Sequence, residues 1–214
     1  MQQAALQQAA LRVAVTGNIG SGKSTLARMF EEFGACRVDA DAVSRRVVTE
    51  STALQQQLAA AFGAELLDQE GHLDRRGLAR RALADAAGRQ LLEDLIRPHL
   101  QPVLEAELAS TELASAGLAR PIIVLDAPHV FEWKIEDWFD RIFVVSADMG
   151  VADARVAASR DLSLEEVRER RAAQLSDGER RGSFEVVDNN GSLDDLRSMA
   201  ERIWQDLADA PGAG

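Results

Sequence analysis

The feature that most constrains this chain is a glycine-rich segment near its start. Residues 17–24 match the pattern G-x-x-x-x-G-K-[ST] without a mismatch, and the loop lies between a short apolar run and an amphipathic run. In such a loop the glycines let successive backbone N–H groups face phosphate oxygens, the lysine reaches the β- and γ-phosphates, and the final hydroxyl ligates Mg²⁺. We therefore expect a nucleoside triphosphate here, with Lys23 as a catalytic group and Ser24 as the metal ligand. The residues expected to bind ATP in this segment are Gly17, Asn18, Ile19, Gly20, Ser21, Gly22, Lys23, Ser24 and Thr25.

Short apolar runs recur along the chain and predict strands at residues 11–16, 36–38, 121–126, 141–146 and 185–188. The continuous apolar run in the third of these is typical of a strand that is buried on both faces of a parallel sheet. Helical patterns separate the runs, and a last amphipathic helix is expected from Ser192 onward. Strands that alternate with helices indicate an α/β fold, a three-layer parallel sheet of the phosphate-loop kinase type.

Residues 42–118 have an almost wholly helical pattern, with breaks expected at Gly63, near Gly71, and at Pro98 and Pro102. This length exceeds what a crossover between two strands requires, so we expect a helical subdomain on the substrate side. The whole is interpreted as one domain over residues 11–208, between a loose extension at 1–10 and a loose tail at 209–214.

The formal net charge of −11 over 214 residues argues against broad nucleic-acid or anionic-membrane binding. An anionic substrate must therefore meet a local cluster of positive charge. No apolar run approaches the roughly 20 residues of a membrane-spanning helix. The single cysteine, Cys36, is expected to be a buried small hydrophobe. We expect a cytoplasmic protein that is a monomer or a weak homo-oligomer.

Acidic residues follow two of the predicted strands. Asp39 and Asp41 come at the end of the second strand, where a carboxylate can take a proton from an attacking hydroxyl or hold the metal's surroundings. Asp126 ends the third strand, a common place for an acid near Mg²⁺ in phosphate-loop enzymes. The alternative for all three is an ordinary turn or helix-capping acid.

An arginine-rich segment at about residues 150–182 is predicted to form a lid. Arginines there can neutralise charge on a transferred phosphoryl group, or they can form ion pairs along a helix face. Ser163 and Glu166 form a capping box that predicts a helix to about Leu175.

Other reaction classes lack their signatures. The three histidines, His72, His99 and His129, share no metal-ligand spacing with one another or with Cys36, and there is no Gly-x-Ser-x-Gly nucleophile elbow. The Asn-Lys-x-Asp motif of GTPases and the Leu-Ser-Gly-Gly-Gln signature of transporter ATPases are also missing. A kinase is therefore the better class. These residues do not identify its acceptor, and a non-catalytic nucleotide-binding role also stays open.

Five segments in order resemble the dephospho-CoA kinase family. They are the loop at 16–25, Val-Asp-Ala-Asp at 38–41, Asp-Ala-Pro-His-Val-Phe-Glu at 126–132, Arg170 with Gln174, and Asp-Asn-Asn-Gly at 188–191. The resemblance spans about residues 11–205. It implies transfer of the ATP γ-phosphate to the ribose 3′-hydroxyl of dephospho-CoA, the last step of coenzyme A synthesis, with Mg²⁺ as cofactor.

The resemblance also implies roles for individual residues. Asp41 would be the general base, Asp39 would lie beside the substrate, and Arg160 would be the lid arginine on the phosphates. The turn of Asn189, Asn190 and Gly191 would lie beside the adenine. The implied contacts to dephospho-CoA are Asp39, Asp41, Arg97, Pro128 and Glu132.

This chain departs from the family pattern at three places. Arg97 precedes Pro98 where the family usually has histidine, although an arginine could still donate to a phosphate. His129 stands where leucine usually follows Pro128. The spacing after Arg155 is one residue longer than usual, which is why Arg160 is chosen as the phosphate contact.

Overall fold

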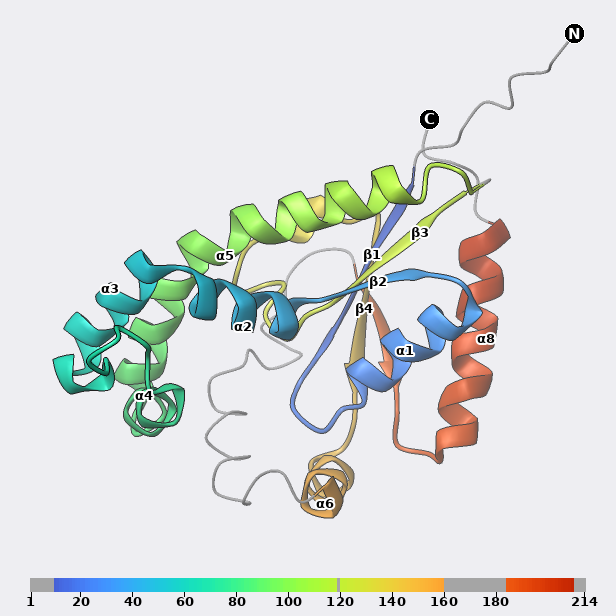
Figure 1. Ribbon diagram of the computed structural model, residues 1–214. Coiled ribbons are helices and arrows are strands. Elements are labelled where there is room, and N and C mark those ends of the chain that lie inside the picture. Colours follow the sequence, from blue (N-terminus) through green and yellow to red (C-terminus); the bar gives the residue numbers. More distant parts are fainter. Residues whose placement is uncertain (1–9, 119, 160–183, 210–214) are drawn as a thin grey trace, which may run out of the picture. The chain divides into compact units, whose positions relative to one another are not determined.

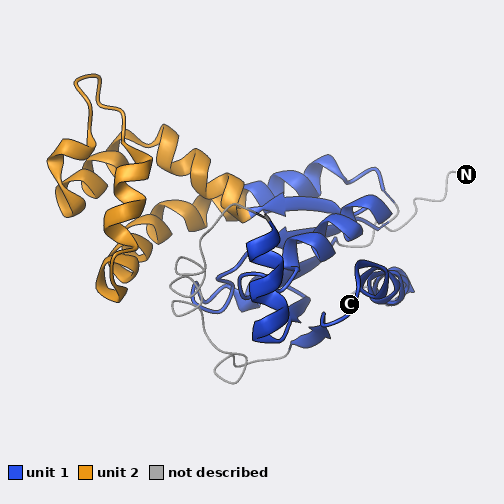
Figure 2. Ribbon diagram, turned by 90° about the horizontal axis from the view of Figure 1, so that it is seen from below, with its two compact units in different colours: residues 1–39, 107–214 blue, residues 40–106 orange. Residues whose placement is uncertain are grey.

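A computed structural model of the chain describes residues 10–118, 120–159 and 184–209 (Figure 1). The chain divides into two compact units, residues 1–39 with 107–214, and residues 40–106 (Figure 2). The first unit contains the sheet and the phosphate loop, and the second consists of helices. Each unit is described by itself below.

The first unit is built on five parallel strands in the order β2-β3-β1-β4-β5. The predicted α/β fold with a parallel sheet is thereby confirmed. Register pairs Val15 on β1 with Asp126 on β3, and Asp126 with Asp39 on β2, so the carboxyl ends of these strands meet at one edge. The strands are β1 (Leu11–Gly17), β2 (Cys36–Asp39), β3 (Ile122–Asp126), β4 (Arg141–Ser146) and β5 (Glu185–Asp188).

One face of the sheet is covered by α1 (Lys23–Phe33) and α8 (Leu193–Asp209). Phe30 on α1 is fully buried, and its ring lies 6.1 Å from Phe143 on β4 and 6.3 Å from Trp204 on α8. Aromatic pairs in this range add to the free energy of burying their surfaces. This core fixes the start of α1, and therefore the phosphate loop, against the sheet.

The opposite face is covered by the end of α5 (Ala86–Ala114), whose Glu112 pairs with Arg12 on β1. Arg12 points away from the face that contains Val13 and Val15, because successive strand side chains alternate. The first unit therefore has the predicted three layers. The remaining described elements of this unit are η2 (Glu136–Trp138) and α6 (Met149–Ser159).

The second unit consists of α2 (Ala40–Glu50), α3 (Thr52–Phe62), η1 (Ala64–Leu66), α4 (Arg75–Ala82) and the first part of α5. Ser51 caps α3 by accepting the N–H of Leu54, and the buried Gln55 donates to the carbonyls of Val48 and Thr49. Gly63 ends α3, as predicted, with a positive φ of 128°. Side-chain bonds to the backbone thus hold the tight connection between α2 and α3.

The predicted breaks at Pro98 and Pro102 are wrong, because α5 continues through both residues. Each proline removes one helical hydrogen bond at a cost of about 3 kcal/mol. Leu100, Leu104 and Leu108 recur every four residues and are buried, and each contributes about 1.5–3 kcal/mol. The burial of this leucine stripe offsets the two lost bonds.

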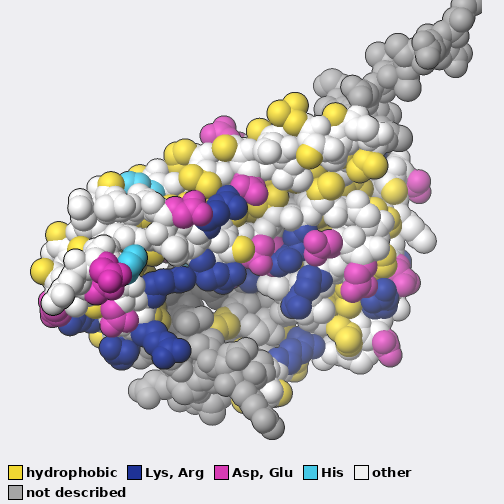
Figure 3. Space-filling model, in the orientation of Figure 1, with side chains coloured by type: hydrophobic (Ala, Val, Ile, Leu, Met, Phe, Trp, Pro, Cys, Tyr) yellow, Lys and Arg dark blue, Asp and Glu magenta, His cyan; other side chains and the backbone are white. Residues whose placement is uncertain are grey.

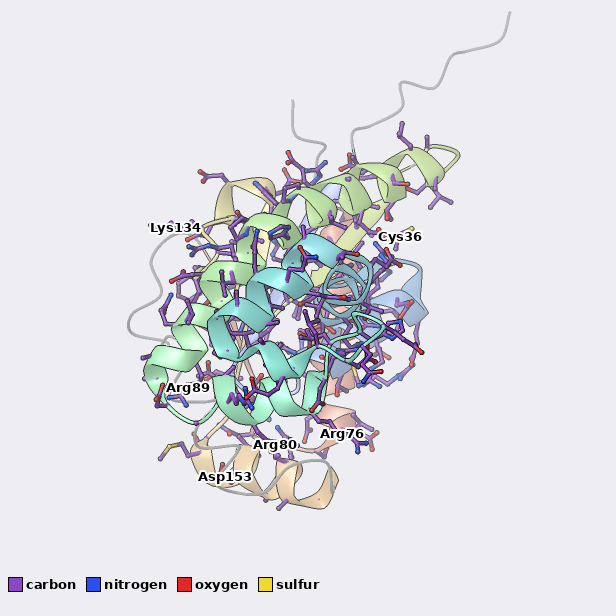
Figure 4. The ribbon with its side chains drawn as sticks, turned by 60° about the vertical axis from the view of Figure 1, so that its left-hand side comes forward. Cys36, Arg76, Arg80, Arg89, Lys134 and Asp153 are labelled. Atoms are coloured by element: carbon purple, nitrogen blue, oxygen red, sulfur yellow. The ribbon has the colours of Figure 1, made fainter. Side chains whose placement is uncertain are left out.

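Cys36 also differs from its prediction, since it is only half-buried. It lies at the start of the edge strand β2 and lines a surface pocket of about 410 Å³ beside the end of α5 (Figure 4). An edge strand has a neighbour on one side only, which leaves the thiol partly open.

None of the helices in the described ranges is long and apolar enough to cross a membrane.

Candidate active site

The phosphate loop connects the end of β1 to the first turn of α1. The N–H of Ser21 donates to the carbonyl of Asn18 and closes a turn in the loop. Helix α1 starts at Lys23, directly after Gly22. The first helical N–H groups have no side-chain cap. They and the positive end of the helix dipole are therefore available to an anion.

Glycine is required at three loop positions by φ values of 152° at Gly17, 78° at Gly20 and 96° at Gly22. A Cβ at Gly17 would collide with the carbonyl oxygen of Val145, and a Cβ at Gly22 with the side chain of Asn189. Backbone packing therefore explains the glycines of the motif as much as access to phosphate does.

Lys23 and Ser24 lie against the carboxylate of Asp126 at the end of β3. Ser24 Oγ donates to Asp126 Oδ1 over 3.2 Å, and Lys23 Nζ lies 3.2 Å from Ser24 Oγ and 3.6 Å from Asp126 Oδ1. The Asp126 side chain is only 3% exposed. The structure thus brings together the predicted metal ligand, the predicted phosphate-binding lysine and the acid that ends the third strand.

A residue that the sequence analysis missed, Arg37 on β2, completes this cluster. Its Nη2 donates to Asp126 Oδ2 over 2.8 Å and to Asp39 Oδ2 over 3.1 Å. Burial of the guanidinium opposes its charge, but the hydrogen bond to Asp126 and the charges of Asp126, Asp39 and Glu31 outweigh this and raise the pKa of Arg37. The buried carboxylate of Asp126 therefore has a permanent positive partner on one side and the loop on the other.

The predicted adenine turn after β5 is bonded to the phosphate loop through its first residue, Asn189. Its buried side chain donates from Nδ2 to the carbonyl of Ser21 over 2.7 Å. Arg155 on α6 donates in turn to the carbonyls of Asn189 and Gly191, over 2.8 Å and 3.0 Å. Asn190 Oδ1 accepts the N–H of Asp148 over 2.7 Å. This network fixes the turn and the loop as one rigid assembly.

The segment after β3 contains the predicted acceptor-binding residues Pro128 and Glu132. The N–H of Ala127 donates to the carbonyl of Val15, which ties the segment to the end of β1. His129 Nδ1 lies 3.8 Å from Glu132 Oε1, and its ring lies 5.7 Å from that of Trp133. The unusual histidine is thus packed within its own segment.

Asp41 and Arg97 belong to the second unit. Asp41 is exposed in the first turn of α2, and Arg97 on α5 pairs with Asp94 over 3.1 Å. The same unit carries exposed arginines on α4, where Arg76 and Arg80 are four residues apart (Figure 4). In the described part of the chain neither arginine pairs with a carboxylate, whereas Arg81 pairs with Glu65 over 2.8 Å.

Arg160 and the part of the predicted lid beyond Ser159 lie outside the described residues, as does the predicted capping box at Ser163 and Glu166. The histidines enter no metal cluster with Cys36 among the residues described. His72 shares an exposed turn with Asp68 and Glu70.

Comparison with known proteins assigns the family. The family profile described as dephospho-CoA kinase matches residues 11–195. The chain belongs to the dephospho-CoA kinase family. A dephospho-CoA kinase of Geobacter sulfurreducens is 36% identical over 193 residues, which cover 90% of this chain and 96% of the relative. One from Frankia casuarinae is 38% identical over 91% of this chain and 82% of the relative.

Solved structures share the fold of this chain. A crystal structure from Thermus thermophilus has 32% sequence identity and a TM-score of 0.71, covering 95% of this chain and 99% of the other. A dephospho-CoA kinase from Campylobacter jejuni has the same fold, with 21% identity, a TM-score of 0.64, and coverage of 92% and 96%. Family members are ATP-dependent kinases, which agrees with the phosphate loop and its acidic partner in the first unit.

Proposed function

We propose that this chain transfers the γ-phosphate of ATP to the ribose 3′-hydroxyl of dephospho-CoA, the final step of coenzyme A synthesis. The observation that carries the proposal is the intact phosphate loop held against Asp126 through Lys23 and Ser24, in a chain of the dephospho-CoA kinase family. We place the activity in the cytoplasm. Both units would act as one kinase domain over residues 11–208, with the helical residues 42–118 on the acceptor side.

The first unit would hold the nucleotide. Loop N–H groups and Lys23 would bind the β- and γ-phosphates, while Asn190 and Gly191 would lie beside the adenine. The oxygen donors of Ser24 and Asp126, 3.2 Å apart, fit the preference of Mg²⁺ for oxygen ligands. Mg²⁺ held by Ser24 and Asp126 would neutralise negative charge on the phosphates. Arg160 stays a candidate for neutralising the charge that develops on the transferred phosphoryl group.

Asp41 would be the general base that takes the proton of the ribose hydroxyl. Its carboxylate is exposed and has no cationic partner among the described residues, whereas Asp39 is paired with Arg37. An exposed carboxylate can be reached by the hydroxyl whose proton it would take. We assign acceptor contacts to Asp39, Arg97, Pro128 and Glu132.

The acceptor is also anionic, because dephospho-CoA contains a diphosphate. The chain as a whole has a net charge of −11, so binding requires local positive charge. Lys and Arg side chains are prominent on the face seen in Figure 3. In the second unit, Arg76 and Arg80 lie on one side of α4 without carboxylate partners among the described residues and suit a diphosphate.

A panel of acceptors tests the proposal. ADP release from Mg-ATP would be measured with dephospho-CoA, with several nucleoside monophosphates and with pantetheine. Among these acceptors, we expect turnover only with dephospho-CoA. Turnover of a nucleoside monophosphate in the absence of any with dephospho-CoA would overturn the acceptor assignment while leaving the kinase class intact.

A further inference from the structure

The strand β2 brings an arginine into the proposed metal site from the side opposite the phosphate loop. Arg37 and Asp39 are two residues apart on β2, so their side chains project from the same face of the strand. Asp39 is the register partner of Asp126 on β3. Two carboxylates at directly paired positions repel each other, and Arg37 Nη2 lies within hydrogen-bond distance of both.

The two oxygens of Asp126 have different partners. Oδ2 accepts from Arg37 over 2.8 Å, and Oδ1 accepts from Ser24 and lies 3.6 Å from Lys23. A partial rotation of the carboxylate plane would move Oδ2 away from Arg37 and Oδ1 away from Ser24. A planar guanidinium on a strand backbone holds this orientation more firmly than a flexible ammonium group would.

We propose that Arg37 is a positioning residue that orients Asp126, so that Oδ1 faces Ser24 and the phosphate loop where Mg²⁺ would bind. The role deepens the proposed function and rests on its Mg-ATP site, but not on the identity of the acceptor. Groups that orient metal ligands from behind typically change metal affinity or activity about 10–100-fold when they are removed. We expect an effect of this size on the Mg²⁺ dependence of ATP binding.

The test is an equilibrium titration of Mg²⁺ with a fluorescent ATP analogue, in the full chain and without any acceptor. Arg37→Met keeps much of the side-chain volume but loses the donors. Without Mg²⁺, we expect Arg37→Met to bind the analogue about as well as the unaltered chain does. With Mg²⁺, the variant should need a concentration at least about 10-fold higher to reach half of the increase in analogue affinity that the metal produces. Arg37→Lys should fall between the two.

Arg141→Met is the matched control. Arg141 lies at the amino end of β4, away from the site edge of the sheet, and also joins two carboxylates, those of Glu185 and Asp206. Its loss should leave the Mg²⁺ dependence unchanged. A wild-type Mg²⁺ dependence in folded Arg37→Met would overturn the proposal. If that variant does not fold, a wild-type Mg²⁺ dependence in Arg37→Lys would do so.

The outcome is independent of the acceptor assignment. If the unaltered chain shows Mg²⁺-dependent ATP binding but does not phosphorylate dephospho-CoA, the proposed acceptor is wrong and Arg37 is still tested by the titration.

Discussion

Two aspartates that are separated by one residue have different surroundings. Asp39 ends β2 and shares Arg37 with Asp126, whereas Asp41 lies exposed in the first turn of α2. The carboxylate of Asp39 is already bonded to a guanidinium, whereas Asp41 has no cationic partner among the described residues. This difference supports Asp41 as the base and Asp39 as a structural and acceptor-binding group.

Asp41→Asn should lower kcat by about 10³-fold, because general bases of this type contribute roughly 10²–10⁴. ATP affinity should stay unchanged, since the loop is intact. Steady-state kinetics and ATP titration would separate the two effects. Glu50→Gln, at the other end of the same helix, is the control and should retain normal turnover. Equal turnover in both variants would remove Asp41 from the mechanism.

Gly22→Ala should weaken both the fold and nucleotide binding. The residue has a φ of 96°, and a Cβ would meet the Asn189 side chain that anchors the loop. Backbone strain of this kind costs about 1–3 kcal/mol. Thermal unfolding with and without ATP would measure both effects. Gly117→Ala is the comparison, because no atom lies within 4 Å of a Cβ there. Similar unfolding temperatures for the two variants would contradict the strain argument.

At the scale of elements, the exposed face of α4 is assigned to the acceptor. We expect Arg76→Ala combined with Arg80→Ala to raise KM for dephospho-CoA about 10-fold or more, because charge-assisted bonds to phosphate contribute about 1.5–3 kcal/mol each. KM for ATP should not change. The control is Arg81→Ala on the same helix, which breaks the ion pair of Arg81 with Glu65 on η1. An unchanged KM for dephospho-CoA in the double variant would remove α4 from the acceptor site.

The start of α8 contains a charge-assisted cap. Asp195 Oδ2 accepts the N–H and the hydroxyl of Ser192 over 2.8 Å and 2.7 Å, and these bonds hold the pKa of Asp195 below its usual range. A lowered pKa in the folded state gives stability that is present above the pKa of the unfolded chain and is lost as pH falls through the folded value. Asp195→Asn should therefore lower the unfolding temperature slightly at pH 7. The difference should begin to shrink as the pH falls below about 4, the pKa of free aspartate, and should vanish below the lower pKa of the folded state. A difference that persists unchanged in acid would rule out a role for the charge.

For the molecule as a whole, the sequence predicts what depends on local pattern. Apolar runs located the five strands, and the glycine spacing located the phosphate loop. The continuous course of α5 through Pro98 and Pro102 was not predicted, because it depends on leucines that tertiary packing buries.

Two contacts of the site could not be predicted in this way. Arg37 contacts an acid 89 positions away, and Asn189 contacts a loop carbonyl 168 positions away. Strand register and the order of strands in the sheet create both contacts. A pattern in a single sequence carries no signal for them beyond the alternation of Arg37 with Asp39.

The loop and the acids at the sheet edge are proposed to belong to one site, where ATP phosphorylates one hydroxyl of one acceptor, dephospho-CoA. The most direct measurement is a reaction with γ-labelled ATP, Mg²⁺ and dephospho-CoA, followed by identification of the labelled product. The account predicts labelled coenzyme A with the phosphate on the ribose 3′-oxygen, formed together with ADP. Label released only as inorganic phosphate, or transferred to a different position, would contradict it.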